Sequence, residues 1–225
     1  MRTLLLATAL LLAVPTASRA EFGLGLRIGY GAPGGDALKA DVAGTGTPTA
    51  FKYSDLISSQ TNFQIDAMFK TGSNTAAGIY LGYAPNKLAG TPFLQCDVPG
   101  VSCSSHTFRA GLQFTGEFVD LGIVGLWGGI GTGFEAIYAT QEGGGAKLEA
   151  QLRGWEWATI SAGADLKLIK LINAGVYISY GFGQFHVQEA KITTPLGTVE
   201  DGGGIGSDAT THNMFQIGLR GMFNL

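Results

Sequence analysis

Long apolar runs are missing from this sequence once its first twenty residues are set aside. The best remaining candidate for a membrane helix, residues 121–134, carries no charge but is shorter than the roughly 20 residues that a spanning helix needs. Six glycines also interrupt it. The sequence therefore excludes a helical membrane protein.

Charged residues are also few. The 14 Lys and Arg and the 17 Asp and Glu make up 14% of the 225 residues, whereas a soluble surface usually carries about 25–35%. A net charge of -3 supplies no basic field for phosphates, so nucleic acid is not expected as a partner. An aromatic content of 10% and regular apolar patterning exclude a disordered chain.

Residues 1–20 are predicted to be a secretory signal peptide. Arg2 precedes an apolar run at residues 4–14, and small residues lead up to Ala20, which is the pattern of a signal cleaved before Glu21. A membrane anchor would need a run about twice as long. The mature protein is therefore expected to be a single domain, residues 21–225.

Cysteine is almost absent, and the two that occur, Cys96 and Cys103, enclose a Pro-Gly pair. In an exported protein, such a close pair is expected to form a local disulfide. Closing so short a loop stabilises a fold by only about 2–3 kcal/mol. No histidine cluster adjoins the pair, so neither a zinc site nor another cofactor is expected.

What the sequence does contain is alternation with a period of two. From Phe22 to Tyr30 the even positions are apolar and the odd positions are glycine or arginine. The same alternation recurs in residues 63–70, 77–83, 108–115, 124–138, 150–164, 171–185 and 212–225. This pattern predicts eight strands, each with one apolar and one small or polar face.

The sixth segment breaks its own phase. Trp155 and Trp157 flank Glu156, whereas Ile160 and its apolar neighbours occupy the opposite phase. We interpret this as a β-bulge after the tryptophan pair, with both tryptophans facing outward and Glu156 facing inward.

The connections between these segments differ in length. Long connections, rich in glycine, threonine, proline or acid, span residues 32–60, 86–105, 139–149 and 186–211. Short ones lie near residues 72, 120 and 168. Because long and short connections alternate, four long loops are expected at one end of the sheet.

Two barrels fit this pattern and differ in which face looks inward. A soluble lipocalin-like barrel would bury the apolar face around a ligand, whereas a membrane barrel would turn it toward lipid. The other face is mostly glycine with scattered single charges, which suits a narrow lumen better than a solvated surface. Aromatic residues also gather near strand ends, as interfacial girdles do. We therefore predict an all-β fold, an eight-stranded antiparallel up-and-down transmembrane β-barrel.

Residues 21–225 resemble the small bacterial outer-membrane β-barrels of the OmpA-like, OmpX-like and OmpW-like kind. The resemblance depends on the signal peptide, the eight segments, the loop asymmetry and the last strand, Phe215–Leu225. Its final aromatic, Phe223, lies two residues before the end, which departs mildly from the family. The resemblance implies a monomer in the bacterial outer membrane that contacts outer-membrane lipid and the outer-membrane assembly machinery.

Several charged residues fall on the face expected to point into the lumen. They are Arg27, Asp66, Lys70, Arg109, Glu117, Glu135, Arg220 and, given the facing of its segment, Glu156. A lone charge in so narrow a space is costly, so both signs are expected to pair in a lumen-filling charge network. A proton path or selectivity filter is the functional alternative.

All three histidines, His106, His186 and His212, fall at strand ends next to the long loops. Glu142, Glu149, Glu189 and Asp208 lie in or near the same rim. A metal site or a His-Ser-Glu hydrolase, as in lipid A deacylase barrels, is conceivable here. The spacing fixes neither, and solvated polar residues explain the same positions.

These observations favour a non-enzymatic outer-membrane barrel with a structural or surface-interaction role. Its four long loops would meet an extracellular ligand whose identity the sequence does not specify. The alternatives are a lipid-modifying hydrolase with an active site at the rim and a conduit for small hydrophobic molecules in the OmpW-like manner.

Overall fold

The computed structural model describes residues 21–40, 49–89, 96–204 and 209–225. The expected signal peptide, residues 1–20, and the rim residue Asp208 lie outside the described residues.

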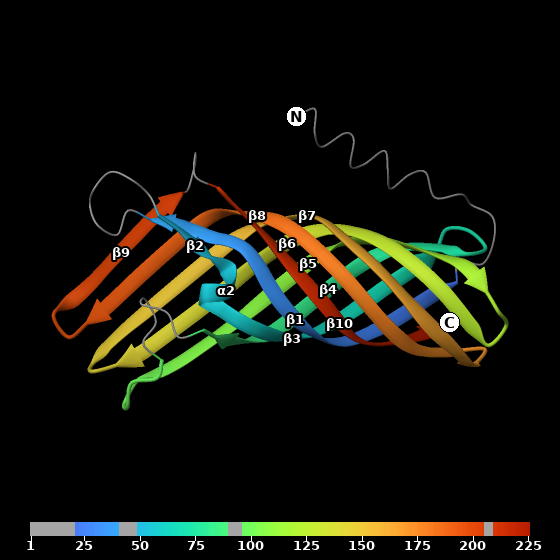
Figure 1. Ribbon diagram of the computed structural model, residues 1–225, viewed down its shortest axis with the longest axis horizontal. Helices are drawn as coiled ribbons and strands as arrows, with labels where there is room; N and C mark the ends of the chain where they lie inside the picture. The colour runs from blue at the N-terminus through green and yellow to red at the C-terminus, as the bar shows by residue number, and fades with distance from the viewer. Residues whose placement is uncertain (1–20, 41–48, 90–95, 205–208) are drawn as a thin grey trace.

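Eight strands form a closed antiparallel ring (Figure 1), which confirms the predicted fold class. They are β1 (Phe22–Ala40), β3 (Ile57–Lys70), β4 (Thr75–Leu88), β5 (Ser102–Asp120), β6 (Val124–Gly143), β7 (Ala146–Ile169), β8 (Ile172–Thr194) and β10 (Thr210–Asn224). Each strand pairs with its neighbour in the chain, β8 pairs with β10, and β10 pairs with β1 to close the ring.

The facing of the strands follows the alternation in the sequence. On β1, Leu26 and Ile28 are 65% and 45% exposed, whereas Arg27 between them is 7% exposed. The outward apolar side chains include Leu24, Ile65, Leu81, Leu112, Ile130, Ile178 and Leu219. An apolar outer wall around a polar interior is the arrangement of a membrane barrel and the reverse of a lipocalin-like one.

Two shorter strands and one helix complete the described structure. Strand β2 (Thr49–Lys52) pairs with the far end of β1, and β9 (Gly197–Gly204) pairs with the far end of β8. A single helical turn, α2 (Tyr53–Leu56), connects β2 to β3. None of the described helices is long and apolar enough to cross a membrane.

The two ends of the barrel differ. The turn end carries three short turns, at residues 71–74, 121–123 and 170–171, together with Glu21 and Leu225. Its two terminal strands are joined by a hydrogen bond from Leu225 N to Phe22 O of 2.7 Å. The opposite end, with the longer connections, is the loop end (left in Figure 1).

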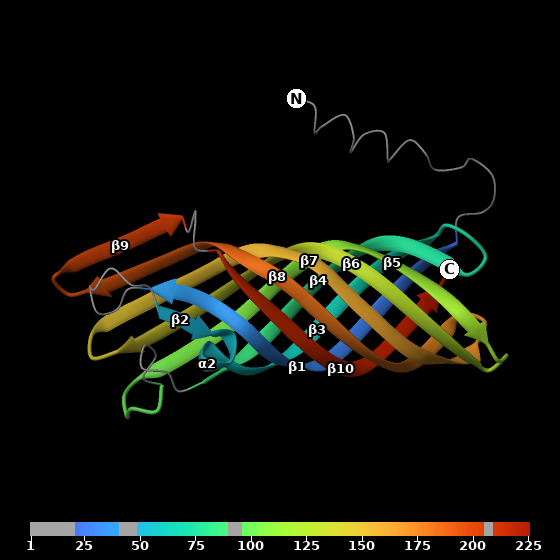
Figure 2. The same cartoon turned by 45° about the horizontal axis from the view of Figure 1, so that its top comes forward.

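Two of the predicted long loops are mostly strand, which corrects that expectation. Strands β6 and β7 continue to a turn at Gly144 and Gly145, where φ values of 61° and 79° require glycine. Strands β8 and β9 likewise continue to a turn at residues 195–196. The backbone hydrogen-bond ladder thus extends past the barrel as the projecting sheet, residues 137–154 and 187–204 (Figure 2).

Polarity reverses where the projecting sheet leaves the barrel. Inward-facing Ile137 and Leu152 are buried and apolar. The outer face carries ion pairs instead, between Lys147 and Glu149 at 2.8 Å and between Arg153 and a carboxylate of β8 at 2.7 Å. A charged outer face does not suit lipid, so the reversal marks the edge of the lipid-facing wall.

Cys96 and Cys103 form the expected disulfide, with 5.6 Å between their Cα atoms. The bond lies at the loop end, where Cys103 pairs with Gln141 of β6.

We expect the double variant C96S/C103S to assemble normally. The bond closes a loop of few residues at the loop end, so its loss costs only about 2–3 kcal/mol. Gel migration of unboiled and boiled samples reports the folded barrel. A variant that shows only the unfolded band would mean that the disulfide is needed for assembly.

Candidate functional site

Pairs of ionisable side chains lie in layers inside the barrel, from the loop end to the turn end. The successive pairs are Glu135 with His212, Arg109 with Glu156, Arg27 with Asp66, Arg220 with Asp165, and Lys167 with Glu117. Arg27 and Asp66 lie on neighbouring strands, whereas each of the other pairs joins two strands that are not adjacent in the ring. Among the described residues, the Arg27 and Arg220 pairs are also linked through Trp127, whose ring lies under both guanidinium groups.

Arg109 and Glu156 form the central pair. The Arg109 side chain is 7% exposed and that of Glu156 is 3% exposed. Arg109 Nε donates to Glu156 Oε2 over 2.9 Å, and the Tyr80 hydroxyl lies 3.4 Å from the same oxygen. Glycine makes room for this tyrosine, because a Cβ built at Gly111 would lie 2.7 Å from Tyr80 Cε1.

A bulge in β7 places Glu156 in this pair. The pairing of β7 with β8 shifts register between Glu156 and Ala158. As a result Trp155 and Trp157 both face outward and remain about half exposed. The interpretation of the phase break as a bulge agrees with this register shift.

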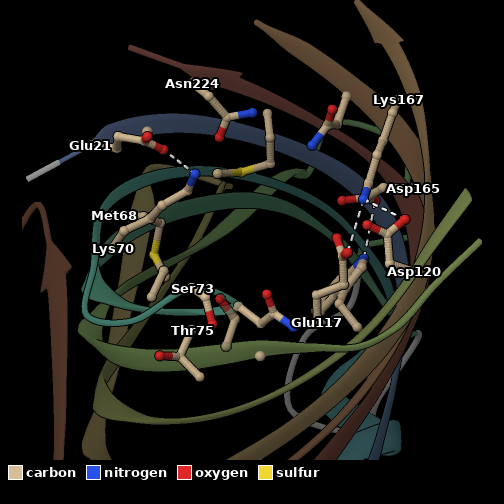
Figure 3. A pocket seen from close by; sticks show the side chains of 18 of the residues that line it. Glu21, Met68, Lys70, Ser73, Thr75, Glu117, Asp120, Asp165, Lys167 and Asn224 are labelled. Atoms are coloured by element: carbon tan, nitrogen blue, oxygen red, sulfur yellow. Dashed lines mark hydrogen bonds and ion pairs between the residues drawn. The ribbon is translucent and has the colours of Figure 1, made fainter. Parts of the chain in front are cut away.

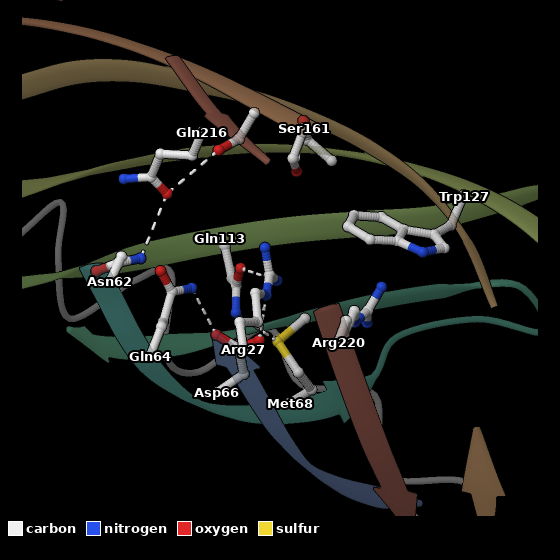
Figure 4. Close-up of polar contacts among 12 residues, drawn as sticks. Arg27, Asn62, Gln64, Asp66, Met68, Gln113, Trp127, Ser161, Gln216 and Arg220 are labelled. Carbon is white, nitrogen blue, oxygen red and sulfur yellow. Dashed lines mark hydrogen bonds and ion pairs between the residues drawn. The ribbon is translucent and has the colours of Figure 1, made fainter. Parts of the chain in front are cut away.

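Arg27 is well supplied with partners (Figure 4). Its Nε donates to Asp66 Oδ2 over 2.7 Å and its Nη2 donates to Gln113 Oε1 over 2.8 Å. The other Asp66 oxygen accepts from Gln64 over 2.7 Å. The free space left between this layer and that of Arg109 is a cavity of about 20 Å³, enough for about one water molecule.

An apolar core closes the lumen at the loop end. Tyr53 of α2 and Phe185 of β8 are fully buried and meet edge to face, with ring centroids 5.7 Å apart. The His212 ring stacks on that of Phe185 with ring centroids 3.9 Å apart. Its Nε2 lies 2.7 Å from Glu135 Oε2. The rest of this core consists of Ala37, Ile57, Ile137, Leu152 and Met214.

The three histidines do not meet at the rim. His212 is 4% exposed, which corrects the interpretation of all three as solvated. His106 lies on the outer wall, stacked on Tyr138 at 5.3 Å, and His186 lies at a bulge in β8. Within the described part of the chain, no group of three or more His, Cys, Asp or Glu is arranged to hold a metal ion.

The predicted rim acids lie apart from these histidines. Glu142 and Glu149 flank Lys147 on the outer face of the projecting sheet, and Glu189 pairs with Arg153 there. The Lys147 hydrogen bond lowers the pKa of Glu149. These acids therefore belong to surface ion pairs.

The turn end opens into a cavity of about 560 Å³, the turn-end vestibule (Figure 3). Its floor includes Trp127, Asp165 and Arg220, and its wall includes Met68 and Met222. At its rim, Lys70 pairs with Glu21, and Lys167 lies 2.9 Å from both Glu117 and Asp120. Lys70 thus lies at the rim, outside the stack of buried pairs.

Sequence reasoning missed four residues of these sites. Asp165 and Lys167 lie just past the end of the predicted sixth segment, residues 150–164. Their inward phase, two and four residues after Gly163, is a signal that would have identified them. Phe185 continues the inward phase of Tyr177, Ser179 and Gly183 on β8, which is also a signal. Tyr53 lies in an aperiodic connection and offers none.

No family model matches the chain, and no curated protein sequence matches it. Solved structures do. A major outer membrane protein from Thermus thermophilus aligns with a TM-score of 0.62 and 10% identity, over 92% of this chain and 100% of that one. The outer membrane protein AlkL, solved in DMPC lipid bilayers, aligns with a TM-score of 0.55 and 14% identity, over 94% of each chain. OprG from Pseudomonas aeruginosa aligns with a TM-score of 0.51 and 12% identity, over 91% of this chain and 96% of that one.

At these identities the likeness concerns the fold. The chain has the fold of small bacterial outer-membrane β-barrels, as its resemblance to that family implied. The predicted location in the bacterial outer membrane agrees with this fold.

Proposed function

We propose that the protein is a non-enzymatic, monomeric outer-membrane barrel with a surface-interaction role. In this proposal the turn end faces the periplasm, because outer-membrane barrels place short turns there and longer loops outside. The wall contacts outer-membrane lipid, the assembly machinery inserts the chain, and the loop end meets an extracellular ligand. One contrast carries the proposal: side chains fill the middle and the loop end of the lumen, whereas the projecting sheet extends far beyond the wall.

The filled lumen argues against transport. The central layers leave a cavity of about 20 Å³, and the apolar core around Tyr53 and Phe185 lies between that cavity and the loop end. Eight strands enclose room for side chains and not for a water column. The accessible chemistry at the loop end is therefore on the projecting sheet, whose outer face bears charged pairs.

A trimmed variant tests the surface role. Ala139 and Ala150 are paired across β6 and β7, so an Asn-Gly turn joining them would remove the tip of the hairpin and keep the barrel. We expect cells that display the full chain to adhere to immobilised glycans or extracellular proteins, and cells with the trimmed chain to lose that adhesion. Equal adhesion by the two, with equal surface display, would contradict the role of the projecting sheet.

We predict no stable porin-sized conductance for the purified protein in planar bilayers. The ion pairs and the apolar core block the axis at two levels, so only brief small openings are expected. Single-channel recording is the measurement. A steady conductance comparable to that of 16-stranded porins would show that the lumen opens.

A conduit for small hydrophobic molecules is the second candidate. The observation in its favour is the apolar core at the loop end, where a polar lumen was expected. Its two largest members, Tyr53 and Phe185, are fully buried, so a guest would have to displace them. Mass spectrometry of co-purified apolar ligands tests this candidate.

The non-enzymatic assignment has its own test, which is mass spectrometry of lipid A. Lipid A that is the same in a knockout strain and in the wild type would support the assignment.

A further inference from the structure

Two arginines face each other inside the barrel near the turn end. Arg27 of β1 and Arg220 of β10 are directly opposite in the antiparallel pairing, and each is 7% exposed. Like charges opposite one another on adjacent strands destabilise a sheet. Each guanidinium therefore needs its own negatively charged or hydrogen-bonding partners.

Of the two, Arg27 is the one that forms short hydrogen bonds with neighbouring side chains. Arg27 has the carboxylate of Asp66 and the amide of Gln113, both within 2.8 Å. For Arg220 the Asp165 carboxylate lies 3.6 Å away, which is too long for a hydrogen bond. Trp127 Nε1 donates to the other carboxylate oxygen, Asp165 Oδ1, over 3.0 Å. The buried Arg220 Nε has no hydrogen-bond partner among the described residues.

Trp127 fixes the orientation of the Arg220 guanidinium. The Arg220 guanidinium carbon lies 4.0 Å from the centre of the Trp127 ring, which is a close cation–π contact. A guanidinium stacked by one face still presents N–H groups along its edge, in the fork that matches the two oxygens of a carboxylate or phosphate. The stacking prepares Arg220 to bind an oxyanion.

The turn-end vestibule gives such an anion access. Arg220 lines this cavity of about 560 Å³ together with Trp127, Met68 and Met222, a volume suited to a small molecule. Among the cations of the rim, Lys167 is already paired with Glu117 and Asp120. Arg220 is the cation at the floor, beside Trp127 and Asp165, and its Nε is engaged by none of the described residues.

We propose that the turn-end vestibule binds a small organic oxyanion, with its carboxylate or phosphate on the Arg220 guanidinium and its apolar part against Met68 and Met222. Asp165 competes with the ligand for Arg220, so affinity is set by the balance between them. The site is separate from the projecting sheet. Its test in detergent depends neither on membrane orientation nor on the proposed surface role, so the two can fail independently.

The three tryptophans allow a direct binding assay. Replacing Trp155 and Trp157 with phenylalanine leaves Trp127 as the sole tryptophan, and its ring touches the proposed site. We expect inorganic phosphate to change Trp127 fluorescence saturably at constant ionic strength and to raise the unfolding midpoint. Phenyl phosphate should bind more tightly, because its ring adds apolar contacts. An absence of saturation with both probes would overturn the proposal.

Matched variants separate binding from structure. R220Q should weaken phenyl phosphate binding by about tenfold or more, and D165N should strengthen it by about tenfold, because asparagine still accepts from Trp127 Nε1 but no longer competes with the anion. K147Q, on the projecting sheet and away from the vestibule, is the control and should leave binding within a factor of about two. If R220Q does not assemble, D165N decides: unchanged affinity there would contradict the proposal.

Discussion

Replacing Glu156 with glutamine is expected to lower the free energy of unfolding by about 3–5 kcal/mol. Arg109 is 7% exposed and would keep its positive charge inside the barrel. It would lose the negatively charged carboxylate that accepts a hydrogen bond from its Nε over 2.9 Å. Removing one partner of a buried pair is costly because the other charge remains desolvated. Denaturant unfolding in detergent micelles, followed by the shift between unboiled and boiled bands, measures the change.

Two variants serve as controls for this result. The double variant R109M/E156L removes both charges and should cost much less than the single change, since apolar residues of similar size replace buried pairs well. Glu149→Gln breaks an exposed pair of the projecting sheet and should have a small effect, as surface pairs do. A loss for E156Q no larger than that for E149Q would mean that the Arg109 layer is hydrated.

Gly111→Val is expected to prevent assembly of the barrel. A Cβ at this position would overlap the Thr132 carbonyl oxygen of the next strand and lie 2.7 Å from Tyr80 Cε1. Overpacking usually costs about 1–3 kcal/mol; here a backbone atom is the obstacle, so the cost should reach or pass the upper end. The folded band of unboiled samples should disappear.

Gly221→Val is the matched control. This glycine is also on a barrel strand, but a Cβ there would meet nothing within 4 Å. The variant should give the folded band at the same level as the parent protein. If G111V also assembled with an unchanged unfolding midpoint, the contact between Tyr80 and the wall would be looser than described.

The fold could be predicted because one period organises the whole wall. Each residue of a barrel strand faces either lipid or lumen, so the alternation seen in Phe22–Tyr30 directly gives the facing. Even the bulge after Trp157 is visible as a change of phase. The sequence pattern does not reveal the projecting sheet, because its polarity is reversed. Its outward residues are charged, as at Lys147 and Glu149, and such a pattern is also typical of a solvated loop.

The partners of the lumen charges could not be predicted in the same way. Which inward residues meet depends on the stagger between strands around the ring, and alternation does not fix that stagger. Arg220 was expected in the charge network, yet its nearest carboxylate is 3.6 Å away, while His212, expected in solvent, lies buried against Glu135. Tyr53 enters the barrel through tertiary packing of a connection without periodicity.

The continuity of β6, β7 and β8 has a mechanical consequence. Each runs as one strand from the turn end through the wall and into the projecting sheet, so a partner attached at the tip pulls nearly along the strands. Such a load stretches many interstrand hydrogen bonds at once, in shear, because those bonds lie across the direction of pull. Peeling, by contrast, would break them one at a time. If the loop end faces outward as proposed, the projecting sheet would transmit tension from such a partner directly into the barrel wall.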